Sequence, residues 1–163
     1  MAVRHEVIRR DPDLILIDSA RKVYQRVDGV FSNVDFYHEI RDIKADDELV
    51  LIICAGKIFV SFDGLQTHHD FSGDTDWTNA IVGAICRTRS YNCIIVATDR
   101  AVLATRISYN YTPTWKLISK LSDITISDMH YNNVDDVVII GTVGSGIWQM
   151  LDLSKHLYNI FAD

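Results

Sequence analysis

Three neighbouring side chains in the sequence are of the types that bind zinc. His68, His69 and Asp70 are consecutive, but successive side chains of a strand point to opposite faces, so only His68 and Asp70 can converge. Two ligands without a third do not make a zinc site. We therefore expect solvated histidines near a turn and no metal site.

The cysteines and a glycine-rich segment offer no catalytic chemistry either. Cys54, Cys86 and Cys93 lie in or beside apolar runs, where a free thiol behaves as a small buried hydrophobe. Cys86 and Cys93 can be neighbours on adjacent strands, but no Cys-x-x-Cys motif accompanies them. Residues 141–146 are glycine-rich without opening a helix, so they indicate a hairpin turn rather than a phosphate loop. We expect no cofactor.

The longest polar loop, residues 72–79, presents a tryptophan among small polar residues. An exposed Trp on a loop is a typical anchor for a protein or a sugar. Trp77, Asp74 and Asp76 are therefore the candidate partner-binding residues. The alternative is that Trp77 folds back over the neighbouring strands.

The elements that position these residues come from an internal repeat. Four times, an unbroken aliphatic run is followed by a short turn and a second, mixed strand. The residues that open the second strands are spaced by 35, 44 and 45 positions, and periods of about 40–50 residues are typical of propeller blades. These residues are Val23, Ile58, Val102 and Ile147.

A further apolar segment precedes each pair of strands and another follows it. The resulting sixteen short strands, in four sets of four, predict an all-β chain: a small β-propeller of four four-stranded antiparallel blades. Residues 157–161 are expected to form the last outer strand, and no helix of importance is expected. We treat residues 1–163 as one propeller domain, with repeats at about 1–36, 37–72, 79–121 and 122–163.

The turns after the second strands resemble the Asp-box, or BNR repeat, of sialidase-like propellers. The best copy has Ser61, Asp63 and Gly64, and partial copies occur in the first and third repeats. The Asp or Asn of the motif is expected to accept hydrogen bonds from its own turn, the Gly to take a positive φ, and the aromatic to pack under the turn. The remaining motif residues are Asp28, Gly29, Ser108, Asn110 and Trp115.

The resemblance also invites a comparison with sialidase chemistry. Such enzymes resemble one another in an Arg-Ile-Pro start, an arginine triad and a Tyr–Glu pair. Here Arg106-Ile107 is followed by Ser, and Tyr37 with Glu39 is the closest Tyr–Glu pair. These residues cannot be placed in the required roles. We therefore expect a non-catalytic member and no enzyme activity.

Composition limits the classes of partner. The net charge of −6 argues against a broad nucleic-acid surface, which requires a basic face. No signal peptide or transmembrane segment is evident, and three unpaired cysteines favour a reducing compartment. We expect no membrane partner and a cytoplasmic or virion location.

By elimination, the leading hypothesis is a structural or protein-interaction module that docks with other protein subunits in a larger assembly, such as a viral particle or tail. The alternative is a carbohydrate-binding propeller that uses the 72–79 loop to hold a glycan. Two questions stay open. The N-terminal strand either shares the last blade or begins its own. The ring either closes as a monomer, which we expect to present the side of its first and last blades to a partner or to a second copy, or two chains form one eight-bladed ring.

Overall fold

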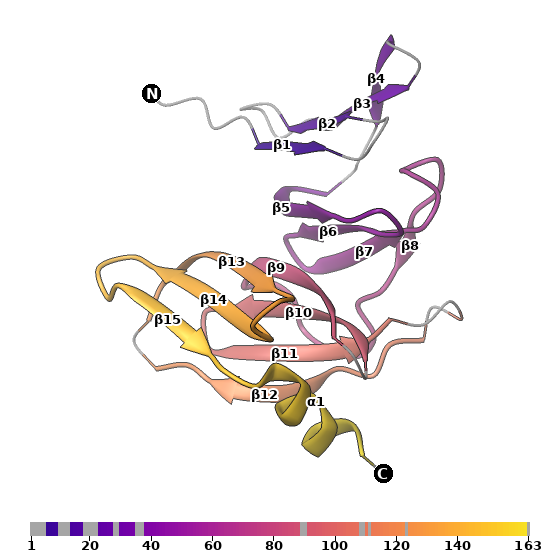
Figure 1. The fold of residues 1–163 in the computed structure, drawn as a ribbon. Helices are drawn as coiled ribbons and strands as arrows, with labels where there is room; N and C mark the ends of the chain where they lie inside the picture. Colours follow the sequence, from indigo (N-terminus) through magenta and orange to yellow (C-terminus); the bar gives the residue numbers. More distant parts are fainter. Residues whose placement is uncertain are drawn as a thin grey trace.

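The computed structural model describes residues 6–9, 14–17, 23–27, 30–34, 38–88, 91–107, 110, 112–122 and 124–162. Within these residues the chain forms four antiparallel sheets, each built from strands consecutive in sequence (Figure 1). Sheet 1 contains β1 (Glu6–Arg9), β2 (Leu14–Ile17), β3 (Val23–Val27) and β4 (Val30–Val34). Sheet 2 contains β5 (Ile40–Ala45), β6 (Val50–Cys54), β7 (Lys57–Ser61) and β8 (His69–Asp70).

The C-terminal half forms the other two sheets. Sheet 3 contains β9 (Ala80–Arg87), β10 (Asn92–Thr98), β11 (Ala101–Arg106) and β12 (Lys116–Lys120). Sheet 4 contains β13 (Ile126–Asn132), β14 (Val137–Thr142) and β15 (Ile147–Met150), and helix α1 (Leu153–Phe161) follows it. The expected all-β architecture of antiparallel sheets is confirmed. β1 pairs with β2, so the N-terminal strand begins its own sheet.

Sheet 4 departs from the expected four four-stranded blades. In the described part of the chain it has three strands, and residues 157–161 belong to α1 rather than to an outer strand. The physical reason is a helical spacing of apolar residues that begins before residue 157. Leu153, Leu157 and Phe161 recur every four residues and are the buried side chains of α1.

The second strands of sheets 2 and 3 are apolar at nearly every position because each has a neighbour on both faces. In β6, Val50, Ile52 and Cys54 join the core shared with Val23 of sheet 1. The alternate residues Leu51 and Ile53 join the core shared with sheet 3. β10 repeats this arrangement, with Ile94 and Val96 toward sheet 2 and the alternate Cys93, Ile95 and Ala97 in the core shared with sheet 4.

The first strands of sheets 2, 3 and 4 lie side by side, β9 between β5 and β13. Among the described residues, no such contact joins β13 to β1. Figure 1 shows sheet 1 beyond sheet 2, and sheet 4 against sheet 3. The four sheets thus form an arc.

A buried carboxylate joins β5 to β9. Asp42 is buried and accepts the backbone N–H of Gly83 at 2.9 Å. Lys44 lies 3.6 Å from Asp42 and 2.9 Å from Asp128 of β13, so its ammonium connects sheet 2 with sheet 4. These polar contacts set the spacing of the three inner strands.

A second polar junction lies nearby. Arg87 of β9 donates to Asp46 at 2.7 Å and lies 3.3 Å from Glu48. Burial raises the pKa of Asp46, but the hydrogen bond from Arg87 and those from the amides of Glu48 and Leu49 outweigh it and hold that pKa below 3.8.

The thiols are part of the core. Cys86 of β9 lies directly opposite Cys93 of β10, and Cys54, Cys86 and Cys93 are free and buried. Burial raises the pKa of Cys54 to about 12 and raises that of Cys86. These thiols therefore act as apolar packing groups.

We predict that Gly83→Ala destabilises the protein. A Cβ at Gly83 would lie 2.7 Å from Ile53 Cδ1 and 3.0 Å from the carbonyl oxygen of Ile95. The free energy of unfolding should fall by about 1–3 kcal/mol, measured by denaturant titration. In the control, Gly141→Ala, the added Cβ meets the Ser127 hydroxyl at 3.1 Å, and the change should stay below about 1 kcal/mol. Equal effects would contradict this packing.

We also predict an acid-dependent loss of stability from Asp46. Because its pKa is lowered in the folded state, its contribution is present above the ordinary pKa of about 3.8 and is lost as pH falls through the lowered value. Thermal melting between pH 7 and pH 2 should show a shallower acid decline for Asp46→Asn and for Arg87→Gln than for the unaltered chain. Parallel curves for all three would refute the role of this ion pair.

Candidate functional site

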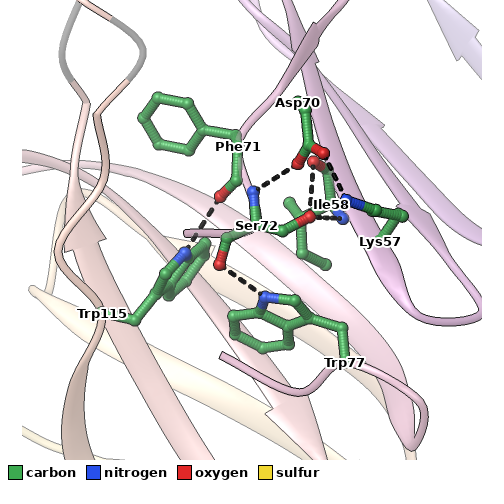
Figure 2. Close-up of polar contacts among 7 residues, drawn as sticks. All are labelled: Lys57, Ile58, Asp70, Phe71, Ser72, Trp77 and Trp115. Atoms are coloured by element: carbon green, nitrogen blue, oxygen red, sulfur yellow. Dashed lines mark hydrogen bonds and ion pairs between the residues drawn. The ribbon is translucent and has the colours of Figure 1, made fainter. Parts of the chain in front are cut away.

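Trp77, expected on an exposed loop, is fully buried. Its indole N–H donates to the carbonyl oxygen of Ser72 at 2.9 Å, and its ring contacts Trp115 edge to face with centroids 4.5 Å apart (Figure 2). The apolar surface of an indole drives it into the core when its N–H finds an acceptor there. The expected exposure of Trp77 is therefore wrong, and the alternative, in which Trp77 folds back, is the one the structure has. The ring of Trp77 is not free to anchor a partner.

Ser72 organises the same region. Its hydroxyl accepts the N–H of Ile58 at 3.0 Å, and its own N–H donates to Asp70 at 2.9 Å. Lys57 pairs with Asp70 at 2.5 Å, as Figure 2 shows. The 72–79 loop is thereby fixed to β7. Asp74 and Asp76 stay exposed, and their contact with a partner stays a prediction.

Trp115 connects two sheets. Its indole N–H donates to the carbonyl oxygen of Phe71, which follows β8, at 3.0 Å. Trp115 itself precedes β12. The aromatic of this turn therefore joins sheet 3 to sheet 2.

The turn after β7 has the expected geometry. Asp63 accepts the N–H of Thr67 at 2.9 Å and the hydroxyl of Ser61 at 2.9 Å, and Gly64 has a φ of 70°. Burial raises the pKa of Asp63, but the bonds from Thr67 and Ser61 lower it below 3.8. The carboxylate is used to hold its own turn, a structural role.

The remaining motif residues are only partly described. The side-chain oxygen of Asn110 accepts the N–H of Thr112 at 3.3 Å. Asp28, Gly29 and Ser108 lie outside the described residues.

No catalytic cluster emerges from the described ranges. Glu39 is exposed, and its candidate partner Tyr37 lies outside those ranges. Among the described side chains, no group of three His, Cys, Asp or Glu could hold a metal ion. In the same part of the chain, no helix has the length and apolarity that a membrane-spanning helix needs.

The surface that stands out is the outer edge of sheet 4. Sheets 1, 2 and 3 end in a fourth strand, but in the described chain β15 is the last strand of its sheet. Ile147 is 74% exposed, Trp148 49% and Leu151 58%. A strand edge carries unpaired backbone N–H and C=O groups, and large exposed apolar side chains beside it mark an interaction surface. We call β15 with Leu151 the open edge.

Helix α1 leaves the open edge uncovered because it packs elsewhere. Leu153, Leu157 and Phe161 join the core between sheets 3 and 4, and α1 contacts β12, as Figure 1 shows. Arg106 donates to the carbonyl oxygen of Phe161 at 2.7 Å and lies over the rings of Phe161 and Tyr91. Arg106, considered at first for a sialidase-like start, thus holds α1 on sheet 3.

Sequence reasoning expected less protected strand edges on the first and last blades but did not locate them at β15. Ile147 and Trp148 belong to the segment assigned to the second strand of the pair, and a further strand was expected outside it. The signal was the four-residue spacing from Leu153 to Phe161, which predicts a helix and so removes the covering strand.

Searches of family models and of curated proteins found no match. Solved structures do match. The computationally designed Ika4 protein superposes with a TM-score of 0.65 at 12% identity, covering 92% of this chain and 91% of that one. The extracellular domain of the putative hybrid two-component system BT4673 from B. thetaiotaomicron superposes with a TM-score of 0.68 at 12% identity. The match covers 93% of this chain and 21% of that one. YCF48 from Cyanidioschyzon merolae superposes with a TM-score of 0.53 at 12% identity, and the match covers 85% of this chain and 51% of that one.

This chain therefore spans about half of the YCF48 chain and about a fifth of the BT4673 chain. Both are β-propeller proteins, and at this identity the likeness shows the fold alone. The chain has a β-propeller-like fold.

Trp77 and Trp148, two of the three tryptophans, make a matched pair for a test of this geometry. Trp77→Phe should lower the free energy of unfolding by about 1–3 kcal/mol, because the carbonyl of Ser72 loses its donor in the core. Trp148→Phe should change it by less than about 0.5 kcal/mol, as is usual at exposed positions. Acrylamide should quench the fluorescence of Trp77→Phe, which keeps exposed Trp148, more strongly than that of Trp148→Phe, which keeps buried Trp77. The reverse order would mean that the 72–79 loop is open.

Proposed function

We propose that this chain is a non-enzymatic protein-interaction module whose open edge accepts a partner protein. The observation that carries the proposal is the absent fourth strand of sheet 4 in the described chain, combined with the exposure of Ile147, Trp148 and Leu151. A strand from a partner can pair with β15 through its backbone, while apolar side chains give affinity.

The chemistry of the edge favours a protein as the occupant. Tryptophan is enriched among the residues that dominate binding energy in protein interfaces. The three exposed apolar side chains flank exposed Gln149, and the edge carries no basic residue that would attract phosphate. A long-lived partner would also protect the edge from uncontrolled edge-to-edge association. A subunit of a larger assembly, as the sequence suggested, is consistent with such a partner.

Glycan binding is not part of the proposal. It depended on an exposed Trp77, and that ring lies in the core. Absence of catalysis is part of it, since Asp63 and Arg106, which the comparison with sialidases drew attention to, serve a turn and the docking of α1.

The test is photo-crosslinking from a benzoyl-phenylalanine placed at Gln149 of β15, with the same group at exposed Gln66 of sheet 2 as the matched control. We expect protein crosslinks of discrete mass from position 149 in the producing cells and none from position 66. Trp148→Ala should reduce the yield at least tenfold, because truncation of a dominant interface residue costs about 2 kcal/mol or more. Equal crosslinking from both positions, or none from position 149, would contradict the proposal.

A further inference from the structure

One face of sheet 4 is apolar at its centre and lacks a neighbouring sheet. Val138 and Ile140 of β14 face the core shared with sheet 3. Val137, which is 8% exposed, and half-buried Ile139 alternate to the other face and join none of the core clusters of the described chain. Ile139 lies between His130 and Gln149 in register, and Ile147, opposite Gly141, shares this face. We call it the outer face of sheet 4.

The other second strands show how such a face is normally used. β6 and β10 each place alternate apolar residues in two different cores, so sheets 2 and 3 are covered on both sides. The outer face of sheet 4 continues this series of stacked sheets. What fits it is therefore another sheet with an apolar second strand.

Sheet 1 stands at the other end of the series. It covers sheet 2 through Val23, and its second strand, β2, has the sequence Leu-Ile-Leu-Ile. A strand that is apolar at all four positions has the pattern of one packed on both faces. Sheet 1 and sheet 4 are thus the two ends that require a neighbour.

Charge supports the pairing of these ends. Residues 37–72 carry three basic and seven acidic side chains, residues 79–121 carry six and one, and residues 122–163 carry one and six. Sheets 2, 3 and 4 alternate in the sign of their charge, and the Arg87–Asp46 ion pair joins two of them. Residues 1–36 carry six basic and six acidic side chains, so sheet 1 can meet the acidic sheet 4 without net like-charge repulsion, which two copies of sheet 4 facing each other would suffer.

We propose that the partner at sheet 4 is a second copy of this chain, whose sheet 1 covers the outer face of sheet 4. The proposal rests on the proposed function, in that sheet 4 is the docking site, and it places the contact on the face that carries Gln149 rather than along the backbone of β15. The same contact made twice joins two arcs into a closed ring of eight sheets, within the usual range for propellers. Such a pair has twofold symmetry and closes, so it does not grow into fibres.

The first measurement is the mass of the full chain in solution by light scattering over a hundredfold range of concentration. The expected mass is twice the 18.5 kDa of one chain. A mass of 18.5 kDa at every concentration would overturn the proposal, because sheet 1 would then cover nothing or cover sheet 4 of its own chain. Species that grow steadily with concentration would overturn the closed pair.

Variants then test the assigned face. Ile147→Glu buries a carboxylate at the contact and should reduce the mass to that of one chain. Val134→Glu makes the same substitution at a more exposed valine in the β13–β14 turn and should leave the doubled mass. Gln149→Arg adds a guanidinium that a contact on the outer face would bury, so it should weaken the pair by at least tenfold in dissociation constant, and thermal melting confirms that each variant folds. A doubled mass that survives both Ile147→Glu and Gln149→Arg would overturn the assignment.

This outcome is separable from that of the crosslinking experiment. A chain that stays monomeric but crosslinks a different protein through position 149 would overturn the second-copy proposal and leave the proposed function standing. Loss of all crosslinks at position 149 would overturn both the second-copy proposal and the proposed function.

Discussion

Central strands that are apolar on both faces can be buried only between two other sheets, and this constraint governs the whole chain. β6 and β10 satisfy it within the chain, because the arc places sheets 1 to 4 in succession. Their close stacking requires glycine at position 83, where even a methyl group would meet Ile53 and Ile95. At β14 the succession ends, and one apolar face is left over. The interaction surface is thus a consequence of the same rule that builds the core.

The repeat and its strands could be predicted from sequence because their signals are local. An aliphatic run such as Val50–Cys54 has few alternatives to a buried strand, and the spacing of the runs reveals the blades. Helix α1 was missed because Leu157 to Phe161 alone fits a strand. The four-residue spacing becomes visible only from Leu153 onward, and the choice between the two structures depends on the core between sheets 3 and 4 that receives these side chains.

The candidate site was harder to predict because exposure is a property of the assembled sheets. Trp77 sits in a polar loop, yet the carbonyl of Ser72 and the ring of Trp115 draw it into the core. Trp148 sits in an apolar strand, yet no strand covers it in the described chain. The exposure of each tryptophan therefore depends on a residue or a strand elsewhere in the chain, which is present for Trp77 and absent for Trp148 in the described chain. Composition does not identify that partner. Asp63, whose partners lie within its own turn, behaves as its sequence motif indicates.

The central claim is that sheet 4 is where this chain meets another protein molecule. Amide hydrogen exchange measures it directly, since backbone amides of a covered sheet exchange slowly. With the purified full chain, the account predicts that peptides spanning β13 to β15 become more protected as concentration rises, while peptides from β7, already enclosed in sheet 2, stay constant. Exchange at β13 to β15 that does not depend on concentration would contradict association of the chain with itself at sheet 4. If exchange at β13 to β15 also stayed unchanged when the crosslinked partner protein was added, the result would contradict the claim that sheet 4 is an interaction surface.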